Sequence, residues 1–182
     1  MIEALISSKT RIKLLLKFFL NSNNEAYLRG LHTEFGESTN GIRVELNRFL
    51  EAGMLSSYTK GNKKYFKANT DHPLFNDIHK ILLKYVGIET IIQNVITRLG
   101  NVETVYLVGE ISKGSESSII DLVLIGDVDQ NYLINLINKA ESMIDKKVRY
   151  MVYSQAEWQQ HQASILKDNA LLIYSNQSSD DE

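Results

Sequence analysis

The chain of 182 residues has no cysteine and a single proline, Pro73. Without cysteine, disulfide bonds and thiolate metal sites are excluded. One proline argues against a proline-rich linker between domains. No apolar run is long enough to cross a bilayer, and the apolar stretch at residues 2–6 is too short for a signal peptide. We therefore expect no membrane partner and a cytoplasmic location.

Charge of either sign is present, but it is unevenly distributed. Residues 1–85 carry thirteen Lys and Arg and eight Asp and Glu, a net charge of +5 (13 − 8). Residues 86–182 carry seven basic and fourteen acidic side chains, a net charge of −7 (7 − 14). Only the first half suits a polyanion electrostatically, so the two halves are expected to do different work.

Three helical patterns follow one another in the first half. Apolar residues at three- and four-residue spacing predict helices over residues 9–20, 25–35 and 39–52. Gly36 can adopt the left-handed conformation that ends the second helix, and Ser38 can cap the third. Two helices joined by a tight turn are a frequent DNA-binding arrangement.

A basic hairpin is predicted directly after the third helix. Residues 54–58 and 64–68 are typical of strands, and Gly61-Asn62 between them favours a hairpin turn. The three helices alone are also compatible with a plain helical core, and the lysine-rich hairpin alone with a soluble sheet edge. Their order favours a winged helix-turn-helix, in which one helix enters the major groove of double-stranded DNA and lysines of the wing neutralise phosphates.

The residues expected to contact DNA follow from that geometry. Asn40 suits adenine and Arg43 suits guanine, because each can form paired hydrogen bonds to one base. The full expected set is Ser38, Thr39, Asn40, Arg43 and Asn47 in the third helix, with Lys60, Asn62, Lys63, Lys64 and Lys67 in the hairpin.

Two strings in this stretch, LNRFLEAGML at residues 46–55 and GNKKYFKAN at residues 61–69, carry a family resemblance. The first 72 residues resemble ArsR/MarR-like winged-helix transcriptional regulators. The resemblance implies binding to a pseudo-palindromic operator as a homodimer. Residues 73–99 predict an apolar helix that Gly87 bends or breaks, and this helix is either the dimer surface or a packing element for its own two domains.

In the second half, a strand over residues 103–109 ends in a glycine, and another strand follows at residues 119–125. Here the chain resembles the minimal nucleotidyltransferase-like fold of the DNA polymerase beta superfamily. In that family a Gly-Ser pair contacts nucleotide phosphates and an Asp-x-Asp pair holds magnesium. The positions that match or replace its motif are Gly109, Glu110, Gly114, Ser118 and Asp121.

The departures from the motif decide the expected activity. Glu110 stands in place of the phosphate-binding serine, and Ile119 stands in place of the first metal-binding aspartate. A lone Asp121 is too little for a two-metal site. The sequence therefore predicts a degenerate motif with no catalytic residue, no metal ligand set and no cofactor. Whether this domain binds a small molecule or a nucleotide is left open.

Together these patterns predict an α+β protein. The expected parts are a winged helix-turn-helix at residues 1–72, a linker or dimerisation helix at 73–99, a small α/β nucleotidyltransferase-like domain at 100–176 and a disordered acidic tail at 177–182. The expected function is a dimeric DNA-binding transcription regulator that is not an enzyme, with the second domain as scaffold or ligand sensor. The alternatives are an active nucleotidyltransferase targeted by its winged helix, and a protein-interaction module that binds no nucleic acid.

Overall fold

The computed structural model describes residues 2–176, which combine helices with two β-sheets in a mixed α+β fold. The chain divides into two compact units, Met1–Tyr85 and Val86–Glu182. The acidic tail expected at residues 177–182 lies outside the described residues. Between residues 2 and 176, no helix combines the length and the apolar character needed to cross a membrane.

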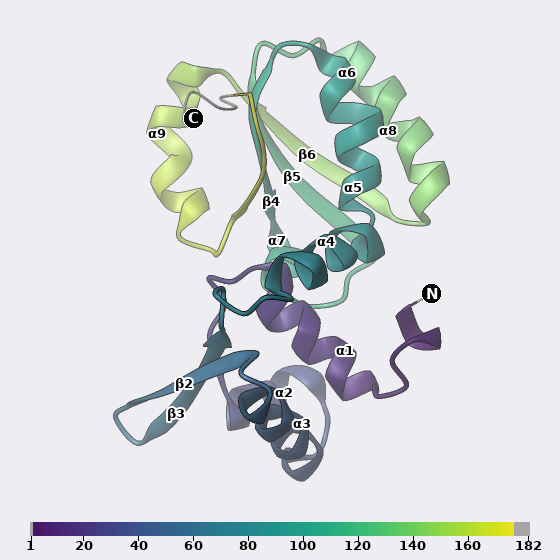
Figure 1. Cartoon of the computed structure of the whole chain (residues 1–182). Helices are drawn as coiled ribbons and strands as arrows, with labels where there is room; N and C mark the ends of the chain where they lie inside the picture. Colours follow the sequence, from purple (N-terminus) through teal and green to yellow (C-terminus); the bar gives the residue numbers. More distant parts are fainter. Residues whose placement is uncertain (1, 177–182) are drawn as a thin grey trace. The chain divides into compact units, whose positions relative to one another are not determined.

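Helices supply the core of the N-terminal unit (Figure 1). Their bounds are η1 Ile2–Ala4, α1 Lys9–Leu15, the π-helical turn η2 Leu16–Leu20, α2 Leu28–Phe35 and α3 Thr39–Glu51. The expected helix at residues 9–20 is thus present, with a π-helical end. Phe18, Phe19, Leu31 and Ile42 are fully buried. Each such side chain stabilises the fold by about 1.5–3 kcal/mol relative to leaving it in water.

The turn between α2 and α3 confirms two local predictions. Gly36 has φ 66° and ψ 22°, the left-handed conformation that ends α2. The Ser38 hydroxyl accepts a hydrogen bond from the Gly41 N–H and caps α3. The expected helix start at residue 25 is wrong, because Ala26–Tyr27 forms strand β1 instead. Pairing of β1 with a distant strand overrides the local helical pattern.

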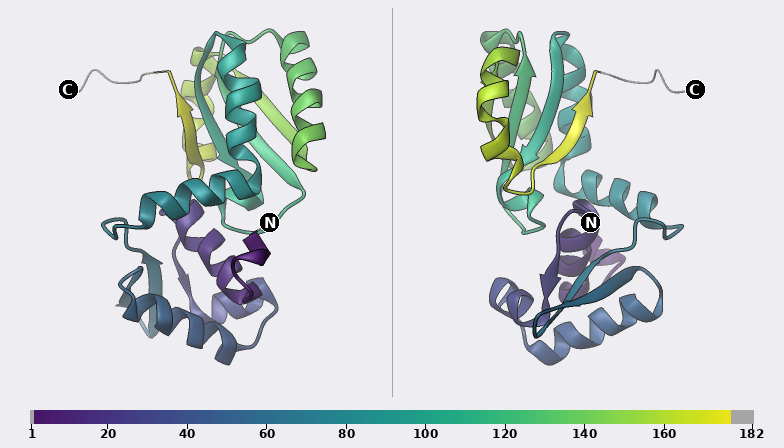
Figure 2. Two further views of the ribbon diagram at one scale, coloured as in Figure 1. Left: turned by 45° about the vertical axis from the view of Figure 1, so that its right-hand side comes forward. Right: turned by 90° about the vertical axis from the view of Figure 1, so that its left-hand side faces the viewer.

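The predicted hairpin is present as β2, Leu55–Lys60, and β3, Lys63–Ala68, and it extends away from the helices (Figures 1 and 2). Gly61 adopts φ 62° in the connecting turn. The strands form an antiparallel sheet in the order β1-β3-β2. One face of this sheet buries Leu55, Phe66 and Ala68.

Helix α4, Phe75–Val86, ends at Gly87, which has φ 90°. The predicted interruption is therefore confirmed, since a left-handed residue cannot continue a helix. A second helical stretch follows as α5 Ile88–Ile91, the π-helical turn η3 Ile92–Ile96 and α6 Thr97–Leu99.

Four strands form the sheet of the C-terminal unit in the order β6-β5-β4-β7. The strands are β4 Val102–Val108, β5 Ile119–Gly126, β6 Lys147–Tyr153 and β7 Leu171–Ser175, and the helices between them are α7 Gly109–Ser112, α8 Gln130–Ile144 and α9 Gln155–Leu166. Strand β5 runs parallel to β6, while β4 runs antiparallel to both β5 and β7. Strand β7 was not expected from the sequence.

Helices cover both faces of this sheet (Figure 1). Helix α9 packs Trp158 against Val123 and Ile125 on one face. The helices α5, α6 and α8 lie on the other face. The buried Leu107 and Leu122 point to that face, because they alternate along their strands with residues that pack against Trp158. Trp158 is 8% exposed and belongs to the core. Asp129 caps α8 by accepting hydrogen bonds from the Asn131 and Tyr132 N–H groups.

Candidate functional site

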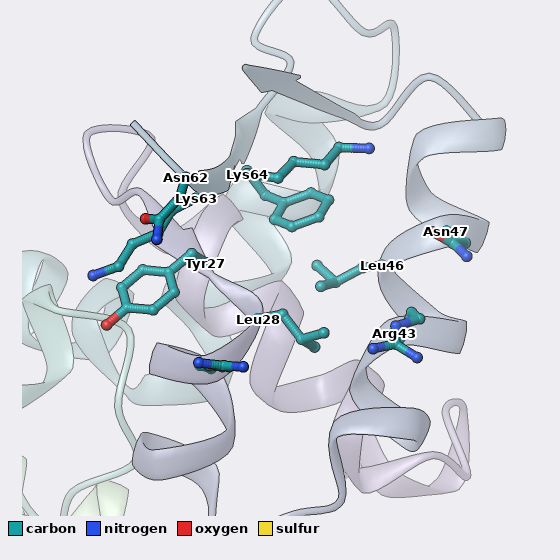
Figure 3. A pocket seen from close by; sticks show the side chains of 10 residues that line it. Tyr27, Leu28, Arg43, Leu46, Asn47, Asn62, Lys63 and Lys64 are labelled. Atoms are coloured by element: carbon teal, nitrogen blue, oxygen red, sulfur yellow. The ribbon is translucent and has the colours of Figure 1, made fainter. Parts of the chain in front are cut away.

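A groove of about 510 Å³ opens between the hairpin and helices α2 and α3 of the N-terminal unit. Figure 3 shows Arg43 and Asn47 on one side of it, and Tyr27, Asn62 and Lys63 on the other. The remaining lining residues are Leu28, Arg29, Leu46, Lys64 and Phe66. The groove therefore has an apolar floor and cationic or amide groups on both walls, a chemistry that suits a phosphate backbone and base edges.

Helix α3 is held in place by a buried carboxylate. Glu45, only 7% exposed, accepts a hydrogen bond from Arg11 Nε at 3.0 Å and one from Arg48 Nη1 at 3.0 Å. The Ser8 hydroxyl donates to the same carboxylate at 3.3 Å. Through Ser8 and Arg11 the Glu45 carboxylate fixes α3 against the start of α1. This network orients the groove wall that carries Arg43 and Asn47.

The groove brings together half of the residues expected to contact DNA. The members that line it are Arg43, Asn47, Asn62, Lys63 and Lys64. The remaining members, which do not line it, are Ser38, Thr39, Asn40, Lys60 and Lys67. Of these, Ser38 uses its hydroxyl as the α3 cap, and Lys60 and Lys67 are exposed on the hairpin strands.

Sequence reasoning missed Tyr27 and Arg29 in this groove. Tyr27 enters it because β1 pairs with β3, and the Lys63 ammonium lies over the Tyr27 ring at 4.2 Å from its centroid. Arg29 lies in the first turn of α2. The sequence signal for Arg29 was a basic residue at the start of a helix, and for Tyr27 there was none, because its place depends on pairing with β3.

Glu37, in the turn before α3, ties that turn to α1. Its carboxylate accepts from the Lys13 ammonium at 2.8 Å and from the Thr10 hydroxyl. Burial raises the pKa of Glu37, but the hydrogen bonds from Lys13 and Thr10 outweigh it and hold the pKa below the ordinary 4.5.

Because the folded-state pKa of Glu37 is depressed, its stabilising contribution is present above the unfolded-state value and is lost as the pH falls through the folded-state value. We expect the free energy of unfolding to fall as the pH drops below about 4.5, and Glu37→Gln to reduce that dependence by at most about 1 kcal/mol. Urea unfolding at a series of pH values measures this. Glu51→Gln, at an exposed position, is the control; equal pH slopes for the Glu37→Gln variant and the unmodified protein would contradict the assignment.

A second cluster lies at one end of the sheet in the C-terminal unit. Asp121 in β5 is the register partner of both Val108 in β4 and Arg149 in β6. Arg149 Nε donates to Asp121 Oδ1 at 2.6 Å, and this hydrogen bond raises the pKa of Arg149. Gly109, at the end of β4, has φ 72°, and a Cβ there would lie 2.4 Å from Asp121 Oδ2. A bare backbone, a carboxylate and a guanidinium therefore meet at one point.

The other residues of the expected nucleotide motif lie apart from this cluster. Glu110 is exposed in α7, and its carboxylate lies 3.9 Å from the Lys113 ammonium. Gly114 adopts φ 82° in the following turn. Ser118 lines a different hollow of about 400 Å³, beside Glu141 and Lys147. Arg149 was not among the expected site residues, because its partner Asp121 lies on another strand, far away in the sequence.

The cluster does not fit a resident pair of magnesium ions, which the resemblance to nucleotidyltransferases implies. Two-metal sites need several carboxylates. Asp121 is bonded to a cation, and among residues 2–176 no three His, Asp or Glu side chains lie close enough together to hold a metal ion.

No family model matches the chain, and no curated protein matches it. Solved structures do. One is a mutant form of the MntA–HpeT toxin–antitoxin system, with 21% identity over 50% of this chain and 73% of that one, at a TM-score of 0.38. A proposed nucleotidyltransferase from Sulfolobus solfataricus has 19% identity over 55% of this chain and 86% of its own, at 0.37. A second MntA–HpeT mutant has 19% identity over 50% and 70%, at 0.35.

This finding corrects the function expected from the sequence. The structures found are described as a toxin–antitoxin system and a nucleotidyltransferase, which contradicts the prediction of a DNA-binding transcription regulator and the prediction that the chain is not an enzyme. With identities below 25% and TM-scores below 0.5, the likeness assigns no role to individual residues.

Proposed function

We propose that the protein is a nucleotidyltransferase whose N-terminal unit targets it to nucleic acid. The observation that carries the proposal is the meeting of Gly109, Asp121 and Arg149 at one end of the four-stranded sheet. A glycine backbone lets a phosphate approach closely, a guanidinium binds phosphate oxygens in a fork, and a carboxylate accepts a proton. Together these groups can hold a triphosphate and accept the proton of an attacking hydroxyl.

The exposure of the two charged side chains suggests how they divide the work. The Arg149 side chain is 68% exposed, and that of Asp121 is 17% exposed. Arg149 is therefore free to turn toward a triphosphate, while Asp121 stays in the sheet. When Arg149 has turned away, the Asp121 carboxylate no longer bonds the guanidinium and is available as a base.

In the proposed reaction an acceptor hydroxyl oxygen attacks the α-phosphorus of a nucleoside triphosphate. The bond between the α-phosphorus and the oxygen that bridges to the β-phosphorus breaks, and pyrophosphate leaves with that electron pair. Asp121 takes the hydroxyl proton and passes it to water. Magnesium that arrives bound to the triphosphate is part of the substrate, since this ion commonly binds through substrate phosphates and few carboxylates.

Glu110 opposes triphosphate binding less than its position in the sequence suggests. Its side chain is 64% exposed and lies 3.9 Å from the Lys113 ammonium, so solvent and a neighbouring cation screen its charge.

For the N-terminal unit we propose a winged helix-turn-helix fold that binds double-stranded DNA along the groove between α3 and the hairpin. Support comes from the cationic walls, with Arg43 on one side and Lys63 on the other. A homodimer belongs to this proposal, because two-fold DNA sites are bound by paired units. Ile81 of α4, 49% exposed, is one apolar side chain that such a dimer would cover.

Transfer of label from an α-labelled nucleoside triphosphate with magnesium, to DNA or to protein, tests the proposed activity. Each of the four common triphosphates is offered in turn. A labelled product is expected with at least one of them, and its absence with all of them and with both acceptors would contradict the proposal.

Lysines of the hairpin should bind DNA without regard to its sequence. Replacing Lys63 and Lys64 together with Ala is expected to weaken duplex binding about tenfold and to lower the slope of log affinity against log salt by about 1.8, for two phosphate contacts. Arg43→Ala should instead change the preference among sequences. Anisotropy titrations with labelled duplexes at several salt concentrations measure both effects.

The matched control removes two exposed lysines from the other unit, Lys139 and Lys167. This control should bind duplex DNA like the unmodified protein. An equal loss of affinity in both double variants would show that overall charge, rather than the hairpin, governs binding.

A further inference from the structure

Three tyrosines form one row across the three-stranded sheet of the N-terminal unit. Tyr65 in β3 is the register partner of Tyr27 in β1 and of Tyr58 in β2. The ring centroids of Tyr58 and Tyr65 lie 5.7 Å apart with the planes 17° from parallel, and those of Tyr65 and Tyr27 lie 5.4 Å apart. Residues paired in register share one face of a sheet, so the rings form a continuous aromatic strip.

The strip lies on the face of the sheet turned away from the core. Phe66, the residue after Tyr65, is 6% exposed and packs inward, and successive side chains of a strand point to opposite faces. Tyr58 is 37% exposed. The outer face of this sheet therefore presents aromatic rings to solvent, whereas a soluble sheet edge usually presents polar side chains.

Lysines flank the strip on both sides. Lys60 and Lys63 are register partners two residues beyond the tyrosines on their own strands, and Lys67 pairs with Ser56 on the other side. All three lysines are exposed. A strip of rings bordered by ammonium groups complements a chain in which flat bases alternate with phosphates.

The Tyr58 ring is held in place before any ligand binds. Its hydroxyl donates to the Glu25 carboxylate at 2.5 Å, and one of its faces rests on Tyr65. The exposed part of the ring is thus its second face and its edge. A fixed ring loses little conformational freedom when a base stacks on it.

We propose that this outer face, the tyrosine strip with Lys60, Lys63 and Lys67, binds single-stranded DNA by stacking unpaired bases on Tyr58. A duplex cannot use the strip in this way, because its base faces are already stacked on one another. The surface is separate from the groove that faces α3, although Tyr27 and Lys63 contribute to both. The proposal of single-stranded DNA binding rests on the part of the proposed function that targets the protein to nucleic acid. It does not depend on nucleotidyl transfer.

The test compares two substitutions of Tyr58 in the full-length protein. Tyr58→Leu keeps apolar bulk but removes the ring, whereas Tyr58→Phe keeps the ring and removes only the hydrogen bond to Glu25. Affinity is measured by fluorescence anisotropy with labelled oligothymidylate of roughly 15 nucleotides and with a labelled duplex. Thermal unfolding followed by circular dichroism verifies that both variants fold.

Stacking on Tyr58 predicts at least about a fivefold loss of oligothymidylate affinity for Tyr58→Leu, with Tyr58→Phe within about twofold of the unmodified protein. Duplex affinity should stay the same in both. Unchanged oligothymidylate binding in Tyr58→Leu, or an equal loss on the duplex, would overturn the proposal. Photocrosslinking with 5-iodouracil in the oligonucleotide should also place an adduct on the peptide that contains Tyr58.

These outcomes are independent of the nucleotide-transfer assay. A protein that transfers nucleotides but binds oligothymidylate equally well with Leu at position 58 would refute the strip alone. A protein that loses oligothymidylate binding with that change but transfers no nucleotide would refute the proposed activity alone.

Discussion

Asp121→Asn is expected to lower the rate of nucleotidyl transfer by at least about a hundredfold, because removal of a general base costs a reaction a factor of about 10² to 10⁴. The amide keeps the size of the side chain and a hydrogen bond acceptor for Arg149, but it cannot take the proton of the acceptor hydroxyl. Initial rates with labelled triphosphate measure the effect.

Asp127→Asn is the matched control, since it makes the same chemical change just beyond the other end of β5. It should leave the rate unchanged. Arg149→Lys adds a second check, because it keeps the positive charge but removes the planar fork that suits phosphate. Transfer that survives Asp121→Asn at the full rate would remove Asp121 from the mechanism.

Gly126→Ala is expected to destabilise the C-terminal unit by about 3 kcal/mol or more. Gly126 ends β5 with φ 146°, a region open in practice only to glycine, and a Cβ there would lie 2.2 Å from the Asn101 carbonyl oxygen. The obstacle is backbone, which cannot rotate away as a side chain would. The new methyl group would therefore push apart β5 and the start of β4, which pair at Val102. Denaturant unfolding followed by Trp158 fluorescence reports on this unit.

Gly36→Ala separates the backbone effect from the clash. Gly36 also has a positive φ, 66°, but a Cβ there would meet nothing within 4 Å. Its expected cost is about 1–2 kcal/mol, the cost of the left-handed conformation for a residue with a side chain. The N-terminal unit has no tryptophan, so its unfolding is followed as the part of the far-UV circular dichroism change that does not coincide with the Trp158 fluorescence change. Equal losses of unfolding free energy in the two variants would show that the Asn101 carbonyl group moves aside, so that the clash adds no cost.

Much of the N-terminal unit could be predicted because its signals are local. Gly36 and Ser38 mark the turn between α2 and α3 through their own backbone and hydroxyl chemistry, and Gly61 marks the hairpin. The apolar spacing that buries Ile42 and Leu46 is likewise a property of one helix. Such features depend on residues a few positions apart, which a sequence displays directly.

The missed features all depend on residues far apart in the chain. Tyr27 forms a strand because Tyr65 is available to pair with it, and Glu45 is buried because Arg11 reaches it. The Asp121–Arg149 contact exists because β5 and β6 run parallel, and nothing near Arg149 in the sequence announces a carboxylate partner. The candidate sites are formed by contacts between residues far apart in the sequence. Single site residues could therefore be predicted more easily than the residues that contact them.

Strand β1 also bears on the order in which the chain folds. Ala26 pairs with Phe66, so strand β1 cannot pair until the much later strand β3 has been synthesised. During synthesis, α2 and α3 can form from contacts between near neighbours, whereas Tyr27 has no strand to join until the hairpin has left the ribosome. The groove wall and the tyrosine strip both need that pairing. The proposed nucleic-acid surfaces are therefore completed only after helices α2 and α3 have been synthesised and the hairpin has followed them.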